Sequence, residues 1–222
     1  MLILRQIRWH LFIAFVATLY TQTVEADTMK FKIVDVNGRA VPDAVISFPE
    51  IPVEKQTQTE IMDQVNKQFS PKVLVVQKDQ AVDFPNSDDI RHHVYSFSNP
   101  NQFEIKLFSG SEAQPLAFKS AGVVVLGCNI HDNMIGYIYV NDNELTIMTD
   151  NEGVASVDFG DTPKPAEFIE LNVWHPELSL MQTERVKLNL KRNKTSHDIV
   201  LPFTIQIEAP KVDKGFKKKF GS

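Results

Sequence analysis

The chain beyond residue 27 is built from short apolar runs that are separated by Asn, Gly, Asp and Pro. The runs are rich in Val, Ile and Phe, and several alternate between apolar and polar residues, which is typical of β-strands in a sandwich. They lack the spacing of three to four residues that marks an amphipathic helix. The pattern therefore predicts an all-β protein with strands near residues 30–36, 41–48, 69–76, 81–84, 93–98, 103–108, 122–128, 135–140, 145–148, 154–159, 168–174, 186–190 and 198–203.

Two connections can be predicted from their composition. Asn37-Gly38 lies between the first two runs, and this dipeptide favours a type I′ turn because both central positions need positive φ. We therefore expect a hairpin there. Residues 51–70 are polar and rich in Gln, which predicts a connecting loop with a short helical turn near Glu60 and Met62.

The order of the runs predicts two β-sandwich domains. The strands within residues 27–50 are too few to bury a face by themselves, so we expect them to complete a sandwich with residues 142–205. A second domain, residues 51–141, would then be inserted between its strands. The alternative is two consecutive domains in which residues 27–50 belong with 51–141. The lysine-rich residues 206–222 predict a flexible basic tail, or alternatively a docking patch for an acidic partner.

The first residues predict a secretory signal peptide. Arg5 and Arg8 precede an apolar core at residues 11–20 that is too short to span a bilayer, and small residues lead up to Ala26. This arrangement indicates cleavage after Ala26, so that residues 1–26 are removed. The alternative is an uncleaved anchor. We expect export, and no stable membrane insertion once the signal is cleaved.

The net charge and the single cysteine narrow the range of possible functions. The chain carries 28 acidic and 23 basic residues, a formal net charge of −5, which argues against nucleic acid as a partner. Its single cysteine cannot form an internal disulfide in an oxidising compartment. An unprotected thiol there would oxidise. A bound metal would protect it, and the surrounding residues favour that interpretation over a buried inert thiol.

The cysteine belongs to a compact group of soft metal ligands. Cys128 is followed by His131 and Met134 at intervals of three residues. A thiolate, an imidazole and a thioether suit copper, whose blue sites combine two His and one Cys in a plane with a weak axial Met. The missing imidazole must come from elsewhere, and His92 and His93 offer it upstream.

Neighbouring residues of a strand face opposite sides, so only one of the two histidines should face a metal. Alternation groups His93 with Tyr95 and Phe97, the more apolar set. His92 would belong with Val94 and becomes the ligand if a bulge, common near such sites, interrupts the alternation. The residues alone leave both choices open.

Residues 91–98 and 123–140 together resemble the ligand segments of the cupredoxins, the blue copper proteins, in an amicyanin/plastocyanin-like version. The resemblance covers roughly residues 60–141. It implies a cupredoxin-like Greek-key β-sandwich in the bacterial periplasm. Residues 30–48 resemble the opening of prealbumin-like or carboxypeptidase-regulatory-like modules, which implies that the other domain is a prealbumin-like or Ig-like sandwich.

The cupredoxin register, in which the upstream histidine is followed two places on by Val, selects His92. The resemblance then implies a type 1 copper site with the ligands His92, Cys128, His131 and Met134. It also places His93 at the position where the family usually has an Asn, whose side chain ties the two ligand strands together.

Four protein ligands leave no open position for a substrate, whereas catalytic metal sites normally keep one. We therefore expect a one-electron carrier that docks transiently on a redox protein of the periplasm, and not an enzyme. The alternative is a copper-delivery or sequestration protein. An oxidase or nitrite-reducing enzyme would need further copper ligands, for which the domain formed by residues 27–50 and 142–205 offers only scattered histidines such as His175 and His197.

Overall fold

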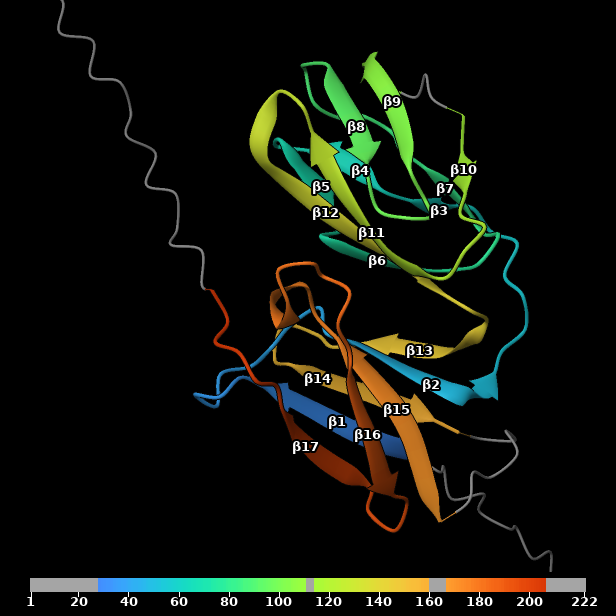
Figure 1. Cartoon of the computed structure of the whole chain (residues 1–222), viewed down its shortest axis with the longest axis vertical. Coiled ribbons are helices and arrows are strands. Elements are labelled where there is room, and N and C mark those ends of the chain that lie inside the picture. The colour runs from blue at the N-terminus through green and yellow to red at the C-terminus, as the bar shows by residue number, and fades with distance from the viewer. Residues whose placement is uncertain (1–27, 111–113, 160–166, 207–222) are drawn as a thin grey trace, which may run out of the picture.

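The computed structural model describes residues 28–110, 114–159 and 167–206 (Figure 1). The predicted signal peptide lies outside these residues, as does the predicted tail except for Gln206. Apart from one 3₁₀ helix, η1 (Pro176–Leu178), the elements are strands. They are β1 (Thr28–Val34), β2 (Val45–Pro52), β3 (Glu60–Ile61), β4 (Asp63–Val65), β5 (Gln68–Ser70), β6 (Val73–Gln77), β7 (Ala81–Asp83), β8 (His92–Ser96), β9 (Phe103–Phe108), β10 (Leu116–Ala117), β11 (Gly122–Cys128), β12 (His131–Asn141), β13 (Glu144–Met148), β14 (Val154–Asp158), β15 (Phe168–Trp174), β16 (Val186–Lys191) and β17 (Ser196–Val200).

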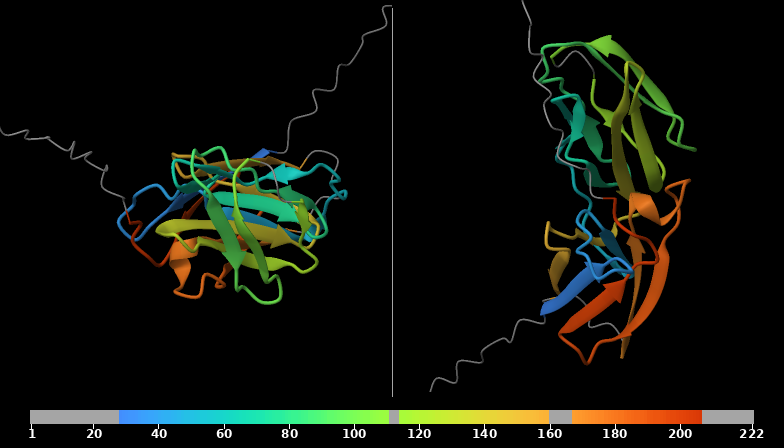
Figure 2. Two further views of the ribbon diagram at one scale, coloured as in Figure 1. Left: turned by 90° about the horizontal axis from the view of Figure 1, so that it is seen from above. Right: turned by 90° about the vertical axis from the view of Figure 1, so that its left-hand side faces the viewer.

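The prediction of an all-β chain is confirmed. Among the described residues we find no helix with the length and apolar character needed to cross a bilayer. The strands form several sheets, which group into two bodies stacked along the long axis of the molecule (Figures 1 and 2).

The first body combines strands from both ends of the described chain. One sheet has the order β14-β1-β17, and the other has the order β13-β2-β15-β16. Residues from both sheets, among them Phe31, Phe48, Val157 and Leu171, form one buried apolar core. Strands β1 and β2 thus share their sheets with strands that follow residue 141. The exact domain bounds at residues 50 and 142 stay a prediction.

The second body is centred on a five-stranded sheet in the order β6-β12-β11-β8-β9. A smaller sheet, β10-β7-β3, and the hairpin β4-β5 accompany it. The core combines Val94, Leu126 and Ile138 of the large sheet with Val82 and other residues of the smaller elements. Strand β12 runs parallel to β6 and antiparallel to β11.

A third buried cluster joins the two bodies, and it contains Val45, Val73, Val123, Tyr137, Tyr139 and Trp174. The Trp174 ring contacts the rings of Tyr137 and Tyr139, at centroid distances of 5.8 and 5.6 Å. The Tyr139 hydroxyl also accepts a hydrogen bond from Arg185 Nε at 3.0 Å. The outer face of β12 is therefore covered by the first body.

The chain turns at Asn37-Gly38 as predicted, with the Asp35 amide on the Arg39 carbonyl and the Val41 amide on the Ile33 carbonyl, but the turn does not join the two predicted strands into one hairpin. Gly38 has a positive φ of 75°, but Asn37 does not, so the turn is not of type I′. Strands β1 and β2 lie in different sheets. After an isolated bridge between Val34 and Ala40, the chain crosses from one layer of the sandwich to the other.

The helical turn expected near Glu60 is also wrong, because that region forms the short strands β3, β4 and β5. A two-residue turn whose φ values fit type I′ lies between β4 and β5. Asn66 and Lys67 both have positive φ there, 54° and 60°, as the two central residues of such a turn require.

Candidate metal centre

Cys128 and His131 face each other across a tight connection. Cys128 ends β11, the turn contains only Asn129 and Ile130, and His131 begins β12 opposite Cys128. The register of the pairing shifts after Gly127, which pairs with Ile135, so that residues 132–134 have no partner on β11 at this end of the hairpin. The sequence predicted that the second strand begins at residue 135. The backbone pairing starts four residues earlier and therefore fixes His131 on a strand.

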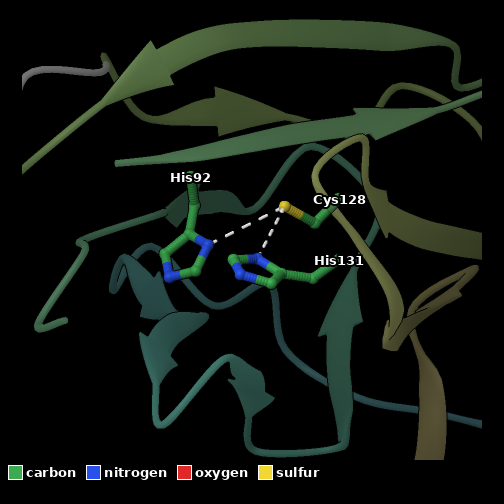
Figure 3. Close-up of side chains that lie close together, drawn as sticks. All are labelled: His92, Cys128 and His131. Carbon is green, nitrogen blue, oxygen red and sulfur yellow. Dashed lines mark hydrogen bonds between the residues drawn. The ribbon is translucent and has the colours of Figure 1, made fainter. Parts of the chain in front are cut away.

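The structure brings three of the predicted ligands together (Figure 3). Cys128 Sγ lies 3.7 Å from His92 Nδ1 and 3.7 Å from His131 Nδ1. The candidate ligand atoms of the three residues all lie within 4.8 Å of one another. Three atoms at such separations leave room for an ion about 2 Å from each, which is the length of metal bonds to imidazole or thiolate. The three residues come from β8, β11 and β12, neighbouring strands of one sheet.

The site is largely shielded from solvent. His92 is fully buried and Cys128 is 4% exposed, while His131 is half-buried. Met134 is also buried, in the same apolar cluster as Cys128 and Val94. It lies on β12 three residues beyond His131. The His131 imidazole is thus the part of the group nearest to solvent.

His93 lies on the other side of the sheet. Its Nε2 is 3.0 Å from Glu104 Oε1, and its ring lies beside that of Tyr95. Burial alternates along β8: His92 and Val94 are buried, whereas His93 and Tyr95 are partly exposed, although the pairing of β8 with β9 shifts register between His92 and Val94. His93, Tyr95 and Phe97 lie on the outward side of the strand, and their rings pack on one another. The more apolar set of residues is therefore the one that faces away from the candidate site.

A carboxylate that the sequence analysis missed contacts the buried histidine. Asp88 Oδ2 lies 2.7 Å from His92 Nε2. Burial alone would raise the pKa of Asp88, but hydrogen bonds from the Lys67 amide, from His92 and from the Asn66 amide hold it below its ordinary value. The signal available in the sequence was an acidic residue four places before a candidate ligand.

The other histidines lie apart from this group. The His175 ring stacks on Phe203, and the His197 ring stacks on Phe31. Within the described part of the chain, His92, Cys128 and His131 are the one cluster of three or more potential metal ligands of the His, Cys, Asp and Glu types. A buried thiol between two imidazoles, with a thioether in the same core, is a soft donor set that fits copper.

Comparisons with known proteins give partial matches. No protein-family model matches the chain, and no curated protein matches it. A copper-containing nitrite reductase from Thermus scotoductus SA-01 is 25% identical over 41% of this chain, with a TM-score of 0.37. The match spans only 25% of that enzyme. A purple cupredoxin from Nitrosopumilus maritimus is 19% identical over 37% of this chain and 98% of its own, with a TM-score of 0.33.

Several amicyanin structures match as well. An oxidised variant is 19% identical over 43% of this chain and 98% of its own, with a TM-score of 0.35. These three solved structures are a copper-containing enzyme and two cupredoxins.

Proposed function

We propose that this protein is an exported copper protein that carries one electron at a time between redox proteins of the periplasm. His92, Cys128, His131 and Met134 would hold the metal in a type 1 site. The observation that carries the proposal is the convergence of the His92, Cys128 and His131 donor atoms within 4.8 Å. Copper held there would supply a one-electron couple between Cu(I) and Cu(II).

The residues are arranged to keep their positions in both oxidation states. His92 on β8, Cys128 at the end of β11 and His131 at the start of β12 each have a paired residue on a neighbouring strand, so these three ligands are fixed by backbone pairing within one sheet. Donor groups on paired strands are held more firmly than donors on long loops. Little rearrangement would accompany the transfer of an electron, which favours a carrier over a protein that takes up and releases metal.

The position of His131 suggests how an electron enters and leaves. His131 is the partly exposed member of the group. Its neighbour Ile130 is 49% exposed, and Ile135 farther along β12 is 37% exposed. A small apolar surface beside an exposed imidazole suits weak and short-lived contact with a redox partner.

The visible spectrum of the Cu(II) protein tests the ligand assignment. We expect an intense thiolate-to-copper band in the wild type, and its loss in Cys128→Ser and His92→Ala. His93→Ala is the matched control because its imidazole faces Glu104 on the other side of the strand, and it should keep the band. A band that survives His92→Ala but disappears in His93→Ala would refute the assignment.

Voltammetry separates the carrier from the delivery protein. A reversible one-electron couple with retained metal supports the carrier. A colourless Cu(I) form that passes its metal to a modest excess of chelator would instead support delivery or sequestration. Met134→Leu should keep the band but change the reduction potential, because the weak axial ligand tunes the potential more than it determines binding.

A further inference from the structure

Asp88 is the junction between the buried histidine and a hairpin of the same domain. Its Oδ1 accepts a hydrogen bond from the Asn66 amide at 2.6 Å, and its Oδ2 accepts one from the Lys67 amide at 2.8 Å. The same Oδ2 lies 2.7 Å from His92 Nε2. Its own backbone amide donates to Asn86 Oδ1 at 3.0 Å.

The hairpin fixes the carboxylate from one side. Asn66 and Lys67 have positive φ, 54° and 60°, so the two successive amides of this turn both donate to one carboxylate. The bond to Asn86, which is itself buried, fixes the backbone of Asp88. The carboxylate is therefore held in place before any metal binds.

This arrangement determines which nitrogen of His92 carries the hydrogen. Backbone amides can only donate, so the oxygens that they contact act as acceptors. His92 completes the set by donating from Nε2 to Oδ2. Its Nδ1 is then left with a free electron pair, and Nδ1 is the atom that lies 3.7 Å from Cys128 Sγ.

We propose that Asp88 is the positioning residue of the metal centre: it holds the His92 ring, selects the tautomer with hydrogen on Nε2, and places a negative charge behind the ligand. The proposal rests on the proposed function because it concerns the same site. Carboxylates in this position orient a metal-bound histidine and make it a stronger donor. The charge stabilises the oxidised metal more than the reduced metal, because the oxidised metal carries the greater positive charge.

Two variants distinguish the contribution of the charge from that of the hydrogen-bond acceptor, because the first removes the charge alone and the second removes both. Asp88→Asn keeps one acceptor oxygen. Placed at the Oδ2 position, that oxygen still serves Lys67 and His92, while the amide NH₂ faces the Asn66 amide. We therefore expect the Nε2–H tautomer to remain but the charge to be lost. Asp88→Ala removes the acceptor and should leave His92 as a mixture of tautomers.

Asp63→Asn is the matched control. The Asp63 carboxylate also anchors this region, through the Ser87 hydroxyl at 2.8 Å and the Ser87 amide at 3.2 Å. No contact between Asp63 and the candidate ligands is found in the described structure. A change that arises only from a loosened loop should therefore appear in Asp63→Asn as well.

The experiment combines ¹⁵N NMR of the histidine rings in the metal-free protein with chelator competition for Cu(II) and Cu(I). For Asp88→Asn we expect Cu(II) affinity to fall about 10- to 100-fold, Cu(I) affinity to fall less, and the reduction potential to rise. Asp88→Ala should show the same trend together with the tautomer mixture. Asp63→Asn should change neither the tautomer nor the ratio of the two affinities.

The two hypotheses fail in different ways. If the wild type binds copper without a thiolate band, or binds none, the proposed function fails. If copper binds as proposed but His92 keeps its tautomer in Asp88→Ala, the positioning role is refuted. Equal losses of Cu(II) and Cu(I) affinity in Asp88→Asn, matched by Asp63→Asn, would also refute it.

Discussion

His175 is a buried neutral histidine whose protonation opposes folding. It is 5% exposed, and its ring stacks on Phe203 with 5.0 Å between centroids. Its Nδ1 accepts a hydrogen bond from the Glu177 amide at 3.2 Å, where it caps η1. Burial lowers the pKa of His175 to about 4 from an ordinary value of 6.5, although a hydrogen bond to the Pro42 carbonyl acts in the opposite direction.

The sign of the effect follows from the two protonation states. Between pH 6.5 and pH 4 the unfolded chain takes up a proton at His175 while the folded chain does not, so acidification favours unfolding. The contribution of neutral His175 to the free energy of unfolding is present in full above pH 6.5 and is lost as the pH falls towards 4. The pKa of His175 differs by about 2.5 units between the unfolded and folded states, and each unit is worth about 1.4 kcal/mol. The free energy of unfolding therefore falls by about 3 kcal/mol by pH 4.

Denaturant unfolding of the metal-free protein between pH 7 and pH 4 measures this loss. His175→Asn is the suitable comparison because its Oδ1 can still accept the hydrogen bond from Glu177. Other groups also titrate: burial raises the pKa of Asp43, which favours the folded state at low pH. The difference between wild type and variant cancels such common contributions. We expect the wild type to lose about 3 kcal/mol more than the variant, and parallel pH profiles would refute the reasoning.

Two further substitutions test the packing and the buried hydrogen bonds. Gly136→Ala would place a Cβ 2.7 Å from Phe69 Cβ, close to the backbone of a buried residue, and urea unfolding should show a loss of about 1–3 kcal/mol; unchanged stability would contradict this. Thr149 accepts from the Ala44 amide at 2.9 Å and donates to the Val41 carbonyl at 2.8 Å. Thr149→Val leaves both groups unpaired and should cost about 2 kcal/mol or more by the same measurement, whereas Thr149→Ser should recover most of it.

Strands with regular alternation could be predicted from the sequence, and polar strands could not. The run at residues 168–174 coincides with β15, and the run at residues 103–108 coincides with β9. Strands β3 and β4 lie in a polar stretch without such a pattern. They are held by contacts with distant backbone, such as the Met62 amide on the Asp83 carbonyl at 2.9 Å. A local pattern carries no information about these partners.

The candidate site shows the same division. The spacing of Cys128, His131 and Met134 is local and could be recognised directly. The choice between His92 and His93 required the register of a strand, because both are equally close in sequence. The position of Asp88 four residues before His92 was not enough to predict their contact, since it depends on the conformations of two separate turns.

Strand β12 links the candidate metal centre to the first body, the sandwich that contains β1 and β2. Its first residues carry His131 and Met134, and farther along Ile138 and Val140 point into the core of their own domain. Tyr137 and Tyr139, which alternate with these two residues, point to the opposite face and pack on Trp174 of the other sandwich. The ligand strand is therefore clamped on both faces. The other sandwich thus holds in place the strand that carries these candidate ligands, and within the described residues it adds no member to their cluster.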